Sequence, residues 1–496
     1  MLKHILMITA GAPLLLAACS GENVQQEAPQ VSVEVVTAMD PPAPNFIVLI
    51  GDDMSVETLS CFGVGEVFAE TPNLDKLCAI GMRFDNFWTQ PVCSPTRAAI
   101  LSGQYGFRNG VGTPAISRIP PQPSPDASAF ATQEFNEGAP RPEPGMRAPA
   151  PGLKPDTFTL PMALKADPET DYETVALGKW HLADPKNGGI DHPNLAGFDY
   201  YRGPIRGGGP GSYFSWSEVE NGVITEGDSG WADSAKIDDA LAFLNNRTGE
   251  QPFLLWMAFN APHGPFHKPP MALLNSDEAK ALDPNGLTQE NHRAYYRAMV
   301  EALDTEIGRL LDGVDPDVMA NTYVLFLGDN GTPEEVANPP FDFYHAKGSI
   351  TQGGVNVPFI FAGPDIEAGS TAALANSVDI YATLVDLAGI DAAQVMPSDT
   401  VFDTISLKPV LKGTAERVRD FAYVDVFGLV PKGIVSEKAI RNETHKLHVM
   451  TDGSEHLFDL MADPYEANDL LEAALSETDQ AAYEDLKTKL TALVSP

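Results

Sequence analysis

The sequence has few of the features that mark a disulfide-rich or nucleic-acid-binding protein. Only 4 cysteines occur in 496 residues, too few for a disulfide framework. Basic residues are also scarce, since 32 Lys and Arg stand against 68 Asp and Glu and give a formal net charge of −36. A field of that sign repels nucleic-acid phosphate, which argues against a nucleic-acid partner. An anionic substrate requires a site that gathers positive groups locally.

Long apolar runs are missing as well. After the first twenty residues no run approaches the ~18 apolar residues that span a bilayer, so we expect no internal transmembrane helix. The hydrophobic share of 43% and the charged share of 20% are ordinary for a globular chain and exclude a disordered or coiled-coil protein. The length predicts about three domains at ~150 residues each.

The start of the chain resembles an export signal. A short basic segment precedes an apolar core of signal-peptide length, followed by small residues that lead into Cys19. Residues 1–19 resemble a bacterial lipoprotein signal with lipid on Cys19; the alternative is a signal peptide cut after Ala18. Residues 20–43 are expected to form a flexible tether. Both interpretations place the folded part outside the cytoplasm. Ser20, by analogy with lipoprotein sorting, favours the outer membrane, facing the periplasm or the cell surface.

From residue 44 on, short apolar runs alternate with helical patterns, which predicts an α/β fold with a mainly parallel sheet. Four of these runs are followed directly by polar side chains: Asp52 and Asp53, Lys179 and His181, His263, and Asp329 and Asn330. A single such residue after a strand is more often a turn or a helix cap. In open α/β sheets the ligand site lies beyond the carboxyl ends of the strands. The repetition therefore predicts one shared pocket.

The oxygen-bearing members of this set suggest a metal. Asp52, Asp53, Asp329 and Asn330 offer three carboxylates and an amide carbonyl, with no Cys or His cluster nearby. Oxygen ligands favour a hard cation such as Ca²⁺ or Mg²⁺ over zinc. Three converging carboxylates without a cation would repel one another strongly.

A cysteine opens a helical pattern over residues 93–103. Ser94 suits the N-cap and Pro95 the first helical position, which places Cys93 at a helix N-terminus. Free backbone N–H groups favour anionic charge there. Arg97 lies one turn further along and is expected to face the same spot. Two other interpretations of Cys93 stay open, a buried structural thiol and a redox thiol.

The run Cys93-Ser94-Pro95-Thr96-Arg97 resembles the Cys-x-Pro-x-Arg motif of the formylglycine-dependent sulfatases, an arylsulfatase-like family of the alkaline-phosphatase-type superfamily. In that family a formylglycine-generating enzyme oxidises the cysteine to an aldehyde-bearing residue. The resemblance extends from about Asn45 to the end of the chain. It rests on segments that stand in the family's order: Asp52-Asp53, Gly178-Lys179-Trp180-His181, Ala261-Pro262-His263, Asp329-Asn330-Gly331 and His456 to Leu470.

The resemblance implies hydrolysis of sulfate esters by hydrated formylglycine at position 93, bound to one Ca²⁺. The implied metal ligands are Asp52, Asp53, Asp329, Asn330 and the modified Cys93. Lys179 and Lys347 would hold sulfate oxygens, Arg97 would steady the nucleophile, His263 would protonate the leaving alcohol, and His181 would help take a proton from the second hydroxyl. A serine could not release sulfate in this way, because its sulfate ester has no second hydroxyl to collapse.

The chain also departs from the family pattern. Gln352 and Asn356 stand where the family segment usually has Glu and Arg, so the local salt bridging of the family is in doubt. Residues 113–157 are rich in Pro and have no clear period. We expect a surface insertion near the pocket mouth, and a loop without a role is the alternative. Cys61 and Cys78 could be bonded or free, and we favour free thiols.

The expected architecture is a main domain over 44–412, with a large mixed, mostly parallel sheet and helices on both faces. Residues 413–496 are expected to form a small antiparallel sheet with a terminal helix. Ser476 can cap that helix, whose apolar face is formed by Tyr483, Leu486, Leu490 and Leu493.

Two rival functions remain open from the sequence. One is a phosphate- or phosphonate-ester hydrolase of the same superfamily, and the other is a lipid-anchored binding protein in which Cys93 is never modified. The alcohol part of the substrate is also open, because a sulfated glycan and a small sulfate ester need the same sulfate subsite.

Overall fold

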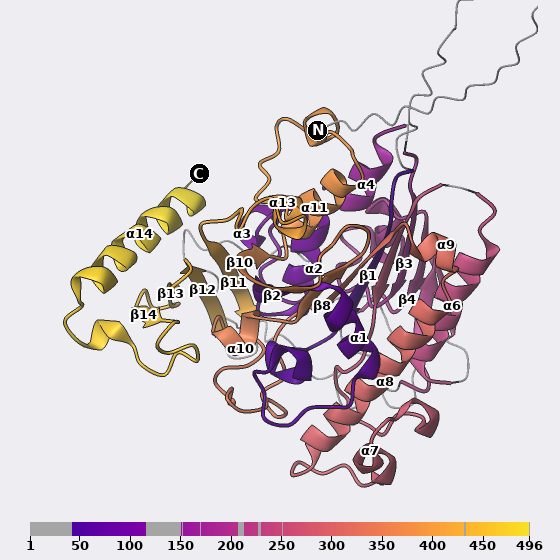
Figure 1. Cartoon of the computed structure of the whole chain (residues 1–496), viewed down its shortest axis with the longest axis horizontal. Coiled ribbons are helices and arrows are strands. Elements are labelled where there is room, and N and C mark those ends of the chain that lie inside the picture. The colour runs from indigo at the N-terminus through magenta and orange to yellow at the C-terminus, as the bar shows by residue number, and fades with distance from the viewer. Residues whose placement is uncertain are drawn as a thin grey trace, which may run out of the picture. The chain divides into compact units, whose positions relative to one another are not determined.

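The computed structural model describes residues 42–115, 150, 152–168, 170–206, 213–226, 230–249, 251–430 and 433–495 (Figure 1). The predicted signal over 1–19 with Cys19, the tether up to residue 41, and most of the 113–157 insertion lie outside the described residues.

A mixed sheet of ten strands forms the centre of the described chain (Figure 1). Its strands lie in the order β10 (Gly369–Asn376), β2 (Met82–Trp88), β9 (Phe359–Ala362), β8 (Thr322–Gly328), β1 (Asn45–Gly51), β7 (Phe253–Ala258), β3 (Glu173–Gly178), β4 (Tyr200–Gly203), β5 (Ser217–Glu220) and β6 (Val223–Glu226). The neighbours β8, β1, β7 and β3 are all parallel. Strand β9 runs antiparallel to both β8 and β2. The predicted mixed, mostly parallel sheet is confirmed.

The four central parallel strands end level with one another. Gly51 of β1 is in register with Gly328 of β8, and Gly178 of β3 with Ala258 of β7. The backbones of β3 and β7 approach closely at this edge. Gly178 has a φ of +88°, and a Cβ atom there would lie 1.9 Å from the carbonyl oxygen of Ala258. Only glycine fits such a position. The polar residues that follow these strands therefore start from one edge.

Helices cover both faces of the sheet, because alternate side chains of each central strand point to opposite sides. On β1, Phe46, Val48 and Ile50 join one apolar core, whereas Ile47 and Leu49 join another. The first core is completed by α2 (Cys93–Ser102), α4 (Leu160–Lys165) and α11 (Asp379–Leu387), and the second by α1 (Pro72–Ile80), α6 (Ala232–Asn246) and α8 (His292–Asp312). The shorter helices are α3 (Gly106–Asn109), α5 (His192–Leu195), α7 (Asp277–Ala281), α9 (Pro316–Met319), α10 (Gln352–Val355), α12 (Ala392–Val395) and α13 (Lys408–Leu411).

The C-terminal part forms its own antiparallel sheet, coloured yellow in Figure 1, as predicted. Its strands are β11 (Ala422–Val430), β12 (Gly433–Arg441), β13 (His445–Val449) and β14 (Glu455–Asp459), followed by α14 (Glu477–Val494). Ser476 begins α14 with a capping box to Asp479. Leu486 and Leu490 of this helix are buried against the sheet. Both the predicted cap and the predicted apolar face are confirmed.

Two features bear on the environment of the protein. Within the described part of the chain, no helix is both long and apolar enough to cross a bilayer. Cys61 and Cys78 form a disulfide with their Cα atoms 6.5 Å apart, so the expectation of free thiols is wrong. Their spacing of 17 residues could not show that the turn at Ser60–Phe62 packs against α1, which brings the two sulfurs together.

Candidate active site

The polar residues after the level strand ends converge, as predicted. One carboxylate oxygen from each of Asp52, Asp53 and Asp329 and the sulfur of Cys93 all lie within 4.8 Å of one another. All four residues are buried. Asp52 and Asp53 follow β1, Asp329 follows β8, and Cys93 opens α2. The sheet edge thus holds a compact cluster of three acids and a thiol, which we call the Cys93 cluster.

Cys93 lies at the N-terminus of α2, but the cap differs from the prediction. The helix begins at Cys93 itself, with Val92 as the N-cap and no side-chain capping bond. Ser94 is not the cap, because its hydroxyl donates to the carbonyl oxygen of His181 at 2.7 Å and accepts the N–H of Ala115 at 2.8 Å. Ser94 therefore ties the start of the helix to the segment that follows β3.

Two lysines flank the sulfur of Cys93. Nζ of Lys179 lies 3.5 Å from it and also pairs with Asp52. Nζ of Lys347 lies 3.6 Å from it and pairs with Asp53. Lys179 is fully buried, whereas the side chain of Lys347 is 21% exposed. Two ammonium groups therefore stand on either side of the sulfur, and one of them faces solvent.

Arg97 acts on the neighbours of Cys93. Its Nε and Nη2 donate to the same oxygen of Asp329 at 3.1 and 2.8 Å, and its Nη1 donates to the carbonyl oxygen of Lys179 at 2.7 Å. The side chain is fully buried. The predicted proximity to Cys93 thus takes an indirect form: Arg97 orients one acid of the cluster and the backbone that carries Lys179.

Both predicted histidines lie at the cluster as neutral imidazoles. His181 has a φ of +60°, and its buried Nδ1 has no hydrogen-bond partner. Burial and Lys179 hold its pKa well below the usual value. His263 places Nδ1 2.7 Å from the carbonyl oxygen of Gly264 and Nε2 3.7 Å from Asp53. Burial lowers the pKa of His263 to about 4, although Asp53 acts to raise it.

The buried acids differ in their electrostatics. Burial and the nearby Asp329 raise the pKa of Asp52 to about 7. Burial also acts to raise the pKa of Asp53, but Lys347 and His263 outweigh it and hold that pKa below the usual value. Burial and Asp329 raise the pKa of the Cys93 thiol. A redox cysteine has a lowered pKa, so the redox interpretation of Cys93 is disfavoured.

The cluster fits an oxygen-liganded cation. The side-chain oxygen of Asn330 is buried and has no hydrogen-bond partner, while its amide nitrogen donates to Asp53 at 2.7 Å. A buried carbonyl without a partner is costly, and a cation would satisfy it. Together with the three carboxylates it forms a donor set that suits Ca²⁺.

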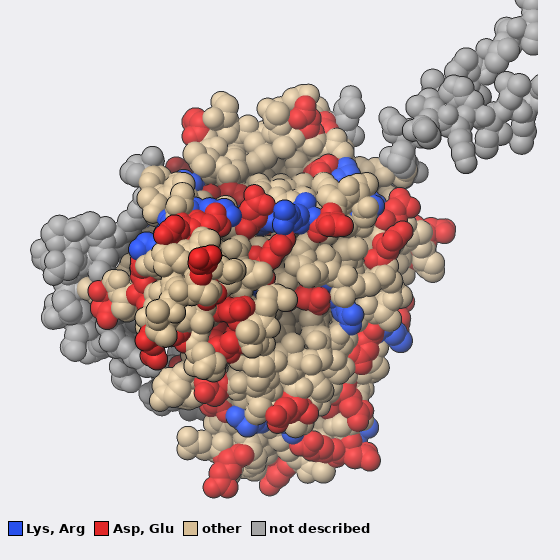
Figure 2. Space-filling model, turned by 60° about the vertical axis from the view of Figure 1, so that its left-hand side comes forward, with Lys and Arg blue, Asp and Glu red and all other residues tan. Residues whose placement is uncertain are grey.

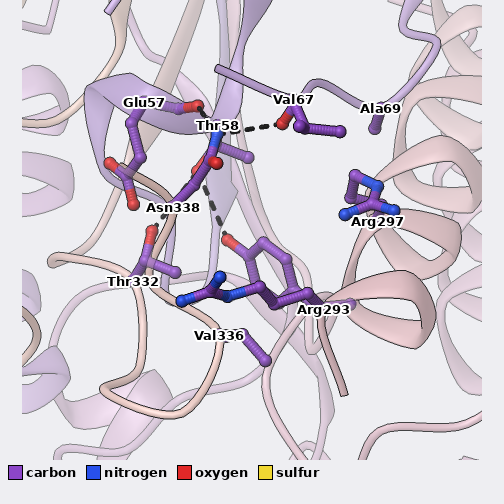
Figure 3. Close-up of a pocket in the computed structure, with 10 residues that line it drawn as sticks. Glu57, Thr58, Val67, Ala69, Arg293, Arg297, Thr332, Val336 and Asn338 are labelled. Carbon is purple, nitrogen blue, oxygen red and sulfur yellow. Dashed lines mark hydrogen bonds between the residues drawn. The ribbon is translucent and has the colours of Figure 1, made fainter. Parts of the chain in front are cut away.

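Further residues behind Asp53 were missed by the sequence analysis. The hydroxyl of Tyr296 donates to the carbonyl oxygen of Asp53 at 2.7 Å, and Thr332 accepts the N–H of Ser55 at 3.1 Å. Both line a small pocket with Thr58 (Figure 3), which has about 20 Å³ of space, enough for a water molecule. Thr332 follows the end of β8 and could have been noticed, but Tyr296 lies within α8 and gives no local signal.

The departures at Gln352 and Asn356 are accommodated by uncharged contacts. The side-chain oxygen of Gln352 accepts the indole N–H of Trp88 at 3.0 Å, and Asn356 donates to the carbonyl oxygen of Asp85 at 3.1 Å. The main-chain N–H of Gln352 donates to Glu466, a buried residue of the C-terminal part that the sequence analysis did not single out.

Known proteins resemble this chain in sequence and in structure. Residues 44–390 match the family model described as Sulfatase. Human N-acetylgalactosamine-6-sulfatase is 30% identical over 75% of this chain and 66% of its own length, and the mouse protein is 31% identical over 76% and 68%. The chain spans about two thirds of the length of these relatives. The crystal structure of Ps i-CgsB in complex with k-i-k-neocarrahexaose superimposes with a TM-score of 0.69 at 25% identity, over 91% of this chain and 92% of that one.

Proposed function

Because this chain belongs to the sulfatase family, and because of the groups around Cys93, we propose that it hydrolyses sulfate esters at the Cys93 cluster. The observation that carries the proposal is the pair of ammonium groups, Lys179 and Lys347, at 3.5 and 3.6 Å from the sulfur of Cys93. A sulfate ester carries its charge on peripheral oxygens, and its sulfur resists attack by an anion. A catalyst must therefore surround those oxygens with cations and hold a nucleophile in line.

Position 93 is proposed to carry formylglycine, with one Ca²⁺ held by Asp52, Asp53, Asp329, Asn330 and the modified residue. The Cys-x-Pro-x-Arg sequence supports the modification, and the free amide oxygen of Asn330 supports the cation. When present, hydrated formylglycine supplies a hydroxyl nucleophile and a second hydroxyl for sulfate release, and Ca²⁺ supplies positive charge.

The residues of the chain then have distinct tasks. Lys179 and Lys347 bind the sulfate oxygens, and Arg97 keeps Asp329 in place. The ring of His263 is fixed through Nδ1 on Gly264, so its Nε2 can hold a proton for the leaving alcohol oxygen.

His181 serves the second half of the reaction. Its Nδ1 is buried and has no hydrogen-bond partner, so it can accept a proton within the site. Its pKa is lowered, which keeps the ring neutral and able to act as a base. We assign it the proton that must leave when sulfate is released.

The substrate is proposed to be a sulfated carbohydrate, supplied either as a glycan or as a smaller sulfated sugar. Two relatives are named for sulfated N-acetylgalactosamine, and a structural neighbour was solved with neocarrahexaose. Both names place a sugar at the alcohol side of the ester in those proteins.

The protein is further proposed to act outside the cytoplasm, anchored through lipid on Cys19 and facing the periplasm or the cell surface. The disulfide between Cys61 and Cys78 supports export, because such bonds persist in oxidising compartments. Modification of Cys93 requires a formylglycine-generating enzyme as a partner.

Two measurements test the proposed function. Mass spectrometry of the peptide that contains Cys93, from protein made in its native host, should show the mass of formylglycine. The same preparation should hydrolyse sulfate esters faster than matched phosphate esters. Unmodified thiol alone would leave a binding protein as the better interpretation, and a preference for phosphate would favour a phosphate-ester hydrolase.

A further inference from the structure

The loop over residues 331–346 begins and ends at one oxygen atom of the Cys93 cluster. Asn330, just before the loop, donates to Oδ1 of Asp53 at 2.7 Å, and Lys347, just after it, pairs with the same Oδ1. The loop leaves the carboxyl end of β8, where the cluster lies. What this loop exposes is therefore presented at the rim of the proposed active site.

Three aromatic side chains of the loop have different environments. Phe341 is buried and packs edge-on against Tyr465, with ring centroids 5.7 Å apart. Phe343 and Tyr344 are 53% and 78% exposed, and their rings stand nearly perpendicular, 5.5 Å apart. Packing explains Phe341 but not the next two rings. Large apolar side chains left in water are typical of a binding surface.

The two exposed rings are held in place by the backbone around them. Oδ1 of Asp342 accepts the N–H of Tyr344 at 2.9 Å and the N–H of His345 at 3.2 Å, and it contacts the ring of His345 at 2.8 Å. The N–H of Lys347 donates to the carbonyl oxygen of Thr332 at 2.9 Å. Three residues separate Tyr344 from Lys347, so their Cα atoms are at most about 11 Å apart. A sugar whose sulfate is held by Lys347 can reach the rings.

The charge of the protein favours an uncharged contact at this place. With a net charge of −36, no general positive field attracts a sulfated chain, and acidic side chains spread over the face in Figure 2. Lys179 and Lys347 are already committed to the sulfate and to the acids of the cluster. The remainder of a sulfated sugar must therefore be held by contacts that do not depend on charge.

We propose that Phe343 and Tyr344 form an aromatic platform on which a sugar ring of the substrate stacks, next to the sulfate held by Lys347. The proposal rests on the proposed function for the sulfate subsite. A pyranose presents a face of C–H groups that matches an aromatic face, and its hydroxyls at the ring edge match the phenol of Tyr344. The platform selects the carbohydrate part, whereas the Cys93 cluster selects the ester.

The experiment measures carbohydrate binding by calorimetry in the calcium-loaded full chain with Cys93→Ala, which prevents turnover. The probes are neocarrahexaose and glucosamine 6-sulfate, each with its desulfated counterpart. Tyr344→Ala and Phe343→Ala should each raise Kd about three- to tenfold for sulfated and desulfated probes alike. Tyr344→Phe should keep most of the affinity. Ile80→Ala is the matched control, because Ile80 is 64% exposed but precedes β2 at the opposite edge of the sheet, and it should change nothing.

The outcomes separate this inference from the proposed function. Unchanged carbohydrate affinity in Tyr344→Ala overturns the platform, and so does a parent protein that binds none of the probes. If sedimentation shows a dimer that Tyr344→Ala dissociates while carbohydrate affinity stays the same, a second copy covers the rings and the inference is wrong. If the unaltered protein hydrolyses no sulfate ester but the desulfated probe still depends on Tyr344, the proposed function fails and the platform stands.

Discussion

Glu466 of the C-terminal part accepts the main-chain N–H of Gln352, at the start of α10 in the main domain. The other carboxylate oxygen of Glu466 lies 2.7 Å from Nζ of Lys446 and 2.8 Å from Nε2 of His448. Gln352 follows Lys347 by five residues. The small antiparallel sheet is therefore joined, through one buried carboxylate, to the segment that carries a lysine of the Cys93 cluster.

Loss of this carboxylate should weaken the fold. Glu466→Gln keeps the size but leaves Lys446 buried without a counter-charge, which costs about 3–5 kcal/mol in the free energy of unfolding. Urea denaturation measures the loss. Glu443→Gln is the control, since that residue forms an exposed pair with Arg417 and should leave the midpoint unchanged. Equal midpoints for Glu466→Gln and the parent would contradict a structural role for this contact.

The same carboxylate should shape the response to acid. Burial acts to raise the pKa of Glu466, but Lys446 and His448 outweigh it and lower the pKa to about 2, below the usual 4.5. Because the folded pKa is the lower one, its stabilisation is present above pH 4.5 and is lost as the pH falls through about 2. The loss is on the order of 3 kcal/mol. Urea midpoints between pH 5 and 2 should fall more steeply in the parent than in Glu466→Gln. Parallel slopes would refute the assignment.

The proposed nucleophile makes a strict demand on position 93. Cys93→Ser should fold normally, because the volume change is small, yet multiple-turnover activity should fall by about three orders of magnitude or more. Intact mass after incubation with substrate should show an added sulfate, since a seryl sulfate has no second hydroxyl to release it. An unchanged thermal melt shows that the fold is intact. Near-native turnover in this variant would refute the proposed chemistry.

Calcium removal should lower both activity and stability. A cation that binds only the folded state stabilises it by about 2.7 kcal/mol at a hundredfold excess over Kd, so exhaustive chelation should lower the melting temperature. Added Ca²⁺ should restore the parent better than Zn²⁺, because the donor set is oxygen-rich. Full activity and an unchanged melting temperature in metal-free protein would contradict a resident cation.

Asp329→Asn separates charge from packing at the same place. The volume hardly changes, but one carboxylate is lost and Arg97, which donates two hydrogen bonds to it, loses its counter-charge. Calcium binding measured by calorimetry should weaken at least about tenfold, and activity should fall with it. Asp238→Asn is the control, because Asp238 forms an exposed pair with Arg309. A silent Asp329→Asn would exclude Asp329 as a ligand.

The sequence predicted those parts of the site that are local in the chain. Each buried run and the polar residue after it can be read from a few neighbouring letters, and the parallel register then brings Asp52 beside Asp329. It could not reveal Tyr296 or Glu466, because their partners lie 243 and 114 residues away and come together only through tertiary packing. The cap was misplaced for the same reason, since the Ser94 hydroxyl is taken by His181, 87 residues further on.

The burial of Cys93 sets an order of events in the making of the protein. Only 2% of this residue is exposed, and two lysines and three acids surround its sulfur. On the proposed function, an oxidising enzyme has to bind the peptide around Cys93 in an open conformation, which the folded chain does not offer. The aldehyde must then be installed while the chain is still emerging or unfolded, before β1 and β8 pair. Protein that folds too early would remain a thiol permanently, stable but without activity, so the yield of active enzyme depends on a race between oxidation and folding.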